Sequence, residues 1–213
     1  DVAFPQTFQP SILKFTENGK LIQYHLGTVK KYSQGPLTRA MVHFRTGLDK
    51  GQTRTFMLQQ DANNHASFED HVILKSIYEE KHTAILHCNK QQVRVPYGIW
   101  RPNRPFSEIY APVVEISYVL GDWVGPGKLH GDLKVERIEA KPFKDGNLFM
   151  EYRIQYWLEG DRKYEVILTL RHDEKYITID EKLQNISPED SLAFRFNYTE
   201  AINPDARTAV SQH

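Results

Sequence analysis

Residues 148–158 read LFMEYRIQYWL, and their side chains alternate between apolar and mostly polar residues. A β-strand places successive side chains on opposite faces, so this period of two predicts a strand with one buried face. The predicted buried face carries Leu148, Met150, Tyr152, Ile154, Tyr156 and Leu158. The opposite face carries Phe149, Glu151, Arg153, Gln155 and Trp157, and we expect a second sheet to cover that tryptophan.

The segments that follow repeat this pattern. Residues 164–170 and 176–183 alternate in the same way, and short polar turns separate them from the first strand and from each other. Consecutive strands joined by short turns form an antiparallel meander. Residues 191–198 add one more alternating segment.

The N-terminal part of the chain also favours strands. Residues 11–16 and 21–26 flank Asn18 and Gly19, a dipeptide that supplies the positive φ angles of a tight hairpin turn. Further strands are expected at residues 37–44, 53–58, 72–77, 83–88, 92–95, 113–120 and 133–139. We therefore predict an all-β protein, an antiparallel β-sandwich with little or no helix.

The chain has 213 residues, which allows one large all-β domain or two smaller ones. We divide it into a β-hairpin region, residues 1–60, and a main sandwich, residues 61–213. The hairpin region either stands apart or belongs to the same sandwich. The sequence begins at Asp1, and residues 203–213 read as a connection to a further segment. We therefore expect this chain to be a fragment of a longer protein.

Composition excludes several classes of protein. The chain has 27 basic and 27 acidic side chains, whereas proteins that bind nucleic acid usually carry a basic excess. The apolar runs are too short to span a membrane. Cys88 is the only cysteine, so no disulfide forms within the chain, and its strand pattern predicts burial.

Two aromatic loops interrupt the strands and carry the best signal for a binding site. Sugars present flat apolar faces ringed by hydroxyls, so aromatic rings beside polar side chains favour carbohydrate. Each tryptophan either forms such a platform or plugs an end of the sandwich core. The candidate carbohydrate-binding residues are Tyr97, Trp100, Arg101 and Arg104 in the first loop, with Asp122, Trp123 and His130 in the second.

Metal and catalytic sites are less well supported. His82 and His87 are an odd number of residues apart on one predicted strand, so they face opposite sides and cannot share an ion. His65, Glu69, Asp70 and His71 match no structural zinc spacing. We predict no metal and no cofactor. Catalytic residues stay unassigned, because each carboxylate that could act on a sugar also fits a solvated turn.

The sequence pattern of the predicted strands in residues 147–185 resembles that of the large galactose-mutarotase-like β-sandwich domains, or super-sandwiches, of carbohydrate-active enzymes. The matching segments read LFMEYRIQYW, YEVILTL and YITIDEKL, and SQGPLTRA at residues 33–40 is similar to a Gly-Pro-x-x-Arg-Ala turn of these domains. Such domains occur in polysaccharide lyases and glycoside hydrolases. The paired His and Glu residues of aldose mutarotases have no match here, so mutarotase activity is not implied.

The resemblance implies the N-terminal β-sandwich region of an exported polysaccharide-processing enzyme, periplasmic or extracellular. Its expected partners are an oligo- or polysaccharide and a catalytic domain beyond residue 213. Two alternatives stay open: a self-contained enzyme acting on sugar, and a non-catalytic carbohydrate-binding or adhesion module. Neither nucleic acid nor a membrane span is expected.

Overall fold

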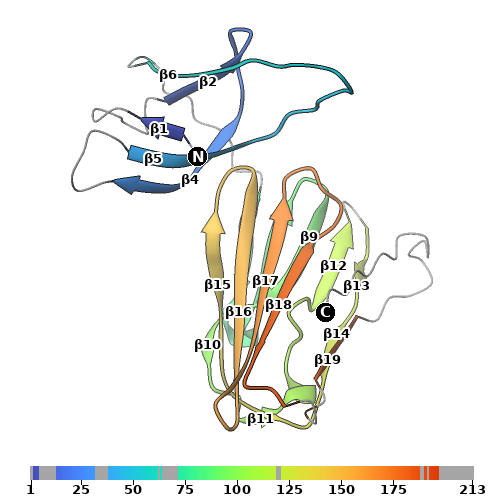
Figure 1. Cartoon of the computed structure of the whole chain (residues 1–213). Helices are drawn as coiled ribbons and strands as arrows, with labels where there is room; N and C mark the ends of the chain where they lie inside the picture. The colour runs from blue at the N-terminus through green and yellow to red at the C-terminus, as the bar shows by residue number, and fades with distance from the viewer. Residues whose placement is uncertain are drawn as a thin grey trace. The chain divides into compact units, whose positions relative to one another are not determined.

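The structure of the chain is a computed structural model. It describes residues 2–4, 13–31, 38–61, 63, 72–118, 121–187, 190 and 192–196. The chain divides into two compact units (Figure 1). The first unit comprises Asp1–His71 with Gly146–Phe149, and the second comprises Val72–Asp145 with Met150–His213. This division falls after residue 71, and the separation of a hairpin region at residue 60 stays a prediction.

The first unit contains two three-stranded antiparallel sheets. One sheet has the order β1 (Val2–Phe4), β5 (Thr38–Phe44), β4 (Tyr24–Lys31), and the other has the order β3 (Lys20–Leu21), β2 (Leu13–Glu17), β6 (Phe56–Gln60). Asn18 and Gly19 have φ angles of 50° and 78°, and they join β2 to β3 with Glu17 opposite Lys20. The predicted Asn-Gly hairpin is therefore confirmed. The strand expected at residues 21–26 is divided between β3 and β4, which belong to different sheets.

Aromatic side chains form the centre of the first unit. The buried Phe15 ring stacks on Phe56 at 5.6 Å and meets the edges of Tyr24 and Phe44. The Tyr24 hydroxyl donates a hydrogen bond to the Leu13 carbonyl at 2.6 Å, and burial raises the pKa of Tyr24. This unit thus has a small aromatic core of its own.

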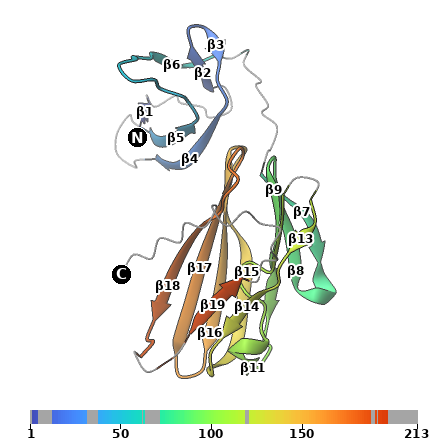
Figure 2. The same ribbon diagram turned by 90° about the vertical axis from the view of Figure 1, so that its right-hand side faces the viewer.

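The second unit is a sandwich of two antiparallel sheets (Figure 2). The main sheet contains β10 (Gly98–Trp100), β11 (Arg104–Pro105), β15 (Lys134–Asp145), β16 (Phe149–Leu158), β17 (Arg162–Arg171) and β18 (Thr178–Gln184). Strands β16, β17 and β18 lie side by side in chain order. They are the meander that the period-two pattern predicts.

The facing sheet has the order β13 (Trp123–Val124), β12 (Glu115–Tyr118), β9 (Gln91–Pro96), β8 (Thr83–Cys88), β7 (Ile73–Tyr78). A separate pair joins β14 (Gly127–His130) to β19 (Ala193–Phe196). Across the described ranges the only helical segments are two short 3-10 turns, Glu79–Lys81 and Phe106–Glu108. The all-β, antiparallel sandwich is confirmed.

The core lies between the main sheet and the facing sheet. Tyr152, Ile154 and Tyr156 of β16 are fully buried, as their alternation predicts, and so is Cys88 of β8. Two tyrosines also bond across the core. Tyr152 donates from its hydroxyl to the Pro96 carbonyl at 2.8 Å, and Tyr156 donates to the Tyr110 carbonyl at 2.9 Å. Burial raises the pKa of both phenols, so they stay neutral donors.

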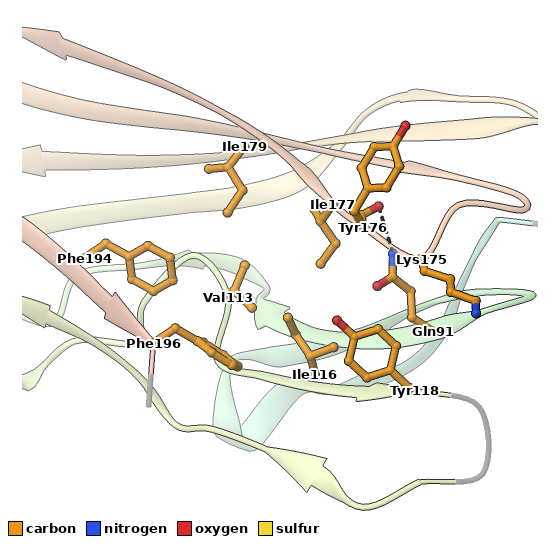
Figure 3. Close-up of a pocket in the computed structure, with 10 residues that line it drawn as sticks. All are labelled: Gln91, Val113, Ile116, Tyr118, Lys175, Tyr176, Ile177, Ile179, Phe194 and Phe196. Atoms are coloured by element: carbon orange, nitrogen blue, oxygen red, sulfur yellow. Dashed lines mark hydrogen bonds between the residues drawn. The ribbon is translucent and has the colours of Figure 1, made fainter. Parts of the chain in front are cut away.

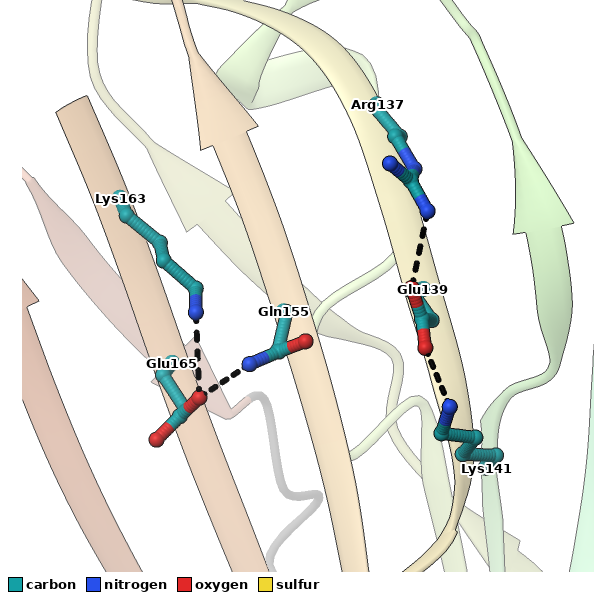
Figure 4. Close-up of polar contacts among 6 residues, drawn as sticks. All are labelled: Arg137, Glu139, Lys141, Gln155, Lys163 and Glu165. Atoms are coloured by element: carbon teal, nitrogen blue, oxygen red, sulfur yellow. Dashed lines mark hydrogen bonds and ion pairs between the residues drawn. The ribbon is translucent and has the colours of Figure 1, made fainter. Parts of the chain in front are cut away.

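The outer face of the main sheet carries a polar network (Figure 4), and none of the sheets formed by the described residues pairs Trp157 with a covering strand. Glu139 accepts from Arg137 at 3.0 Å and from Lys141 at 2.5 Å, while Glu165 accepts from Gln155 and Lys163. The Trp157 ring lies on this face, with Arg137 at 4.7 Å and Lys163 at 5.2 Å from its centroid. The expectation that a sheet covers Trp157 is wrong, because these cations cover the ring through cation–π contacts.

Strand β14 passes very close to the backbone at Val113. A β-carbon at Gly127 of β14 would lie 1.9 Å from the Val113 carbonyl oxygen, so only glycine fits this close backbone approach.

Glu181 lies on β18, the last strand of the main sheet, and is opposite Val166. Its carboxylate accepts a hydrogen bond from the Tyr164 hydroxyl on the core side of the sheet.

Candidate functional site

The first aromatic loop begins where the chain leaves the facing sheet. Strand β9 ends at Pro96, and β10 starts at Gly98 and pairs with the edge of β15 in the main sheet. Gly98 has a φ of 88°, a left-handed conformation that glycine adopts without steric cost, and it thereby allows the change of sheet. Trp100 is paired with the buried Ile138, so its side chain lies on the core side of β10.

Trp100 is half-buried and stacks on His82. Their ring centroids are 4.7 Å apart and the planes are inclined by only 4°. His82 follows the Glu79–Lys81 turn with a φ of 48°, and its carbonyl accepts from the Tyr97 backbone N–H at 2.8 Å. The turn geometry and this bond hold the exposed imidazole against the indole. Trp100 also packs against the core, so it is both a partial plug and part of an aromatic surface.

A pocket of about 620 Å³ opens beside this stacked pair. Its lining comes from the Glu79–Lys81 turn, the end of β10, β11 and the Phe106–Glu108 turn. The lining residues are Glu80, Lys81, His82, Trp100, Arg101, Pro102, Arg104, Glu108, Ile109 and Tyr110. This volume falls within the range of about 300–1,000 Å³ that is typical of small-molecule sites.

The pocket contains more positive than negative charge. Lys81, Arg101 and Arg104 are its cations, against Glu80 and Glu108. Within the part of the chain that the structure describes, neither arginine forms an ion pair. Both guanidinium groups are exposed, and each offers a planar fork of donors that matches a carboxylate.

Trp123 belongs to a different environment. It lies on β13, at the edge of the facing sheet, and is 36% exposed. The Arg94 guanidinium lies 5.0 Å from the centroid of its ring and forms an ion pair of 2.5 Å with Glu115. Arg94 thus covers one part of the ring that would otherwise be open to a sugar.

The predicted site residues therefore fall into separate groups. Trp100, Arg101 and Arg104 line one pocket, and Tyr97 supports it through its backbone bond to His82. Asp122 is exposed just before β13, whereas the exposed His130 ends β14 in the separate β14–β19 pair. Among the described residues, no hydrogen bond, ion pair or ring contact joins His130 to Trp123 or Asp122.

Sequence reasoning missed His82 as a partner of Trp100, and Glu108 and Tyr110 as pocket residues. The first contact depends on how β8 and β9 pair, with Thr83 opposite Pro96, which brings the two ends of the hairpin together. The positions of Glu108 and Tyr110 depend on the path of the chain after β11. A prediction of strand pairing would have indicated the first contact, but no local motif indicates the second.

In the described ranges, no group of three or more His, Cys, Asp or Glu side chains is placed to hold a metal ion. The candidate group of His65, Glu69, Asp70 and His71 lies outside those ranges, as do residues 33–37 of the Gly-Pro turn. No helix in the described part of the chain is long and apolar enough to cross a membrane.

Comparison with known proteins returned no matching family model, no matching curated protein and no matching solved structure. By its structure the chain is an all-β protein. Its second unit is an antiparallel sandwich with a cationic pocket beside two stacked aromatic rings.

Proposed function

We propose that this chain is a carbohydrate-contacting β-sandwich region of an exported polysaccharide-processing enzyme, a lyase or a glycoside hydrolase. In this proposal the pocket beside Trp100 binds the sugar, and a catalytic domain beyond residue 213 cleaves the polymer. The pocket supports the binding part of the proposal. The resemblance of the meander to galactose-mutarotase-like domains supports the enzymatic context.

The observation that carries the proposal is the stacked pair of Trp100 and His82 at the wall of a pocket with two exposed arginines. Aromatic surfaces pack against the C–H faces of sugar rings, and neighbouring charged donors bind their oxygens. His82 covers one face of Trp100, so the surface offered to a sugar combines the imidazole with the uncovered part of the indole. The stack also lowers the cost of ordering these rings upon binding.

The excess of cations favours an acidic sugar. A uronate carboxylate can accept two parallel hydrogen bonds from a guanidinium group, and such charge-assisted pairs are about twice as strong as neutral ones. Arg101 and Arg104 are the groups available for this contact. A neutral oligosaccharide offers these guanidinium groups only hydroxyl oxygens, which lack the charge of a carboxylate and therefore make weaker hydrogen bonds.

The test is a calorimetric titration of the whole chain with a uronate oligosaccharide and with a neutral oligosaccharide of the same length. We expect saturable binding of the uronate, and at least roughly tenfold weaker binding by the Arg101→Ala/Arg104→Ala double variant, since one charge-assisted hydrogen bond contributes about 1.5–3 kcal/mol. Arg195→Ala is the matched control, because Arg195 is exposed on β19 and does not line the pocket.

Absence of saturable uronate binding, or an equal loss in Arg195→Ala, would contradict the proposed site. Polymer cleavage is measured in parallel by the release of new chain ends. Cleavage by this chain alone would favour the self-contained enzyme. Binding without cleavage agrees with the proposed region and with its alternative, a non-catalytic carbohydrate-binding module. Fusion to the natural downstream sequence separates these two, because only the first predicts cleavage by the longer protein.

A further inference from the structure

A second, chemically different pocket opens between the two sheets at the edge formed by β18. Its volume is about 430 Å³, and it is lined mainly by apolar side chains from β12, β19 and the segment entering β18 (Figure 3). The apolar lining consists of Val113, Ile116, Ile177, Ile179, Phe194 and Phe196. Most of these side chains also pack against the core, so the groove is an extension of the core that opens to solvent.

One polar side chain lies at the inner wall of this groove. Gln91 of β9 is only 1% exposed, and its Nε2 donates to the Tyr176 carbonyl at 3.1 Å. A carbonyl oxygen can only accept, so the amide nitrogen must be the atom that faces Tyr176. This requirement fixes the orientation of the amide and turns Oε1 toward the groove, as Figure 3 shows.

The Gln91 Oε1 atom has no hydrogen-bond partner among the described residues. A buried acceptor that lacks a partner is unfavourable, so a donor delivered to this atom would stabilise the complex. The remaining polar side-chain groups at the groove, the hydroxyls of Tyr118 and Tyr176 and the ammonium of Lys175, all belong to exposed side chains. Recognition therefore combines an extended apolar wall with one buried acceptor.

We propose that this groove binds a small, flat, apolar molecule that carries one hydroxyl or N–H donor, such as a phenol-like compound. A bare hydrocarbon would leave Gln91 Oε1 unsatisfied. A free sugar would bring many hydroxyls to a wall that offers a single buried acceptor, at a high cost in lost hydration. The ligand chemistry thus differs from that of the cationic pocket beside Trp100, and the two sites share no lining residue.

The proposal is tested with 1-naphthol and naphthalene, which have the same ring system and differ by one hydroxyl. Ligand-observed NMR titrations use the whole chain. We expect saturable binding of 1-naphthol and at least tenfold weaker binding of naphthalene, the loss that corresponds to about 1.4 kcal/mol. Equal affinities would overturn the role of Gln91, and absence of saturable binding of 1-naphthol would overturn the site.

Location is tested by filling the groove. Ile179→Trp places a larger ring at the lining from the partly exposed edge strand, so the fold should tolerate it while 1-naphthol binding is lost. Leu183→Trp is the matched control, because Leu183 is on the same strand and face, is 52% exposed and lies outside the lining. Unchanged affinity in Ile179→Trp, or an equal loss in Leu183→Trp, would overturn the assignment. Neither result bears on uronate binding at the other pocket.

Discussion

Replacement of Gly127 by alanine is the most direct test of the close packing around β14. The φ of Gly127 lies outside the left-handed region, so alanine suffers from lack of space and not from backbone strain. Its β-carbon would lie 1.9 Å from the Val113 carbonyl oxygen, where real contacts are essentially never below 3.0 Å. The neighbouring atom belongs to the backbone, so a side-chain rotation cannot relieve the clash.

The expected cost follows from these distances. Separating the two segments by about 1 Å would break the bond from the Gly127 N–H to the Val114 carbonyl, which is 2.8 Å long in the native chain. Overpacking costs about 1–3 kcal/mol and the lost bond about 1 kcal/mol, so we expect Gly127→Ala to reduce the free energy of unfolding by about 2–4 kcal/mol. The melting temperature should fall by roughly 6–12 °C.

Urea unfolding followed by tryptophan fluorescence measures this cost in the second unit alone. The chain has three tryptophans, Trp100, Trp123 and Trp157, and all of them belong to that unit. Gly98→Ala is the comparison, because its β-carbon meets open space and only its φ of 88° opposes the change. That conformational cost is about 1–2 kcal/mol. If Gly127→Ala proves less destabilising than Gly98→Ala, the argument from close approach is wrong.

Two further predictions concern buried and half-buried polar groups. Tyr152→Phe should lower the free energy of unfolding by about 1–3 kcal/mol, because it removes the donor to the Pro96 carbonyl. The control, Tyr176→Phe at an exposed ring, should change it by less than about 0.5 kcal/mol. Equal effects of the two variants in urea titrations would contradict the hydrogen bond across the core. The hydrogen bond from Lys141, together with nearby cations and against the opposing effect of burial, lowers the pKa of Glu139 below its usual 4.5. The unfolded chain therefore binds more protons in acid, so the stabilisation by Glu139 is complete above that usual value and is lost as the pH falls through the lowered one. Melting temperatures from about pH 6 to about pH 3 should fall less steeply for Glu139→Gln than for the native chain, and parallel curves would show that the network contributes nothing.

The sequence was sufficient where local pattern determines structure. The alternation in residues 148–158 predicted the buried face of β16, and Asn18-Gly19 predicted a hairpin, because both signals depend only on neighbouring residues. Cys88 was correctly placed in the core for the same reason. The alternation of apolar and polar residues was thus enough to predict the fold class.

Long-range pairing was not available from such patterns. Trp157 lies on the face where a covering sheet was expected, but cations from the two neighbouring strands cover it instead. Likewise, Trp100 was recognised as an aromatic in a strand break, but its stacking on His82 depends on the pairing of β8 with β9. Composition alone cannot distinguish an aromatic platform from a core plug, since this half-buried ring has a part in both.

The carboxylate of Glu181 affects how readily copies of this chain associate with one another at high concentration. An open sheet edge can recruit strands from other molecules, and proteins discourage this with charged side chains that point inward from the edge. Strand β18 has such a charge on its core side, held there by the Tyr164 hydroxyl. A visiting strand would have to exclude water from this exposed carboxylate, which costs free energy unless the group gains a partner, so Glu181 disfavours growth of the sheet at this edge.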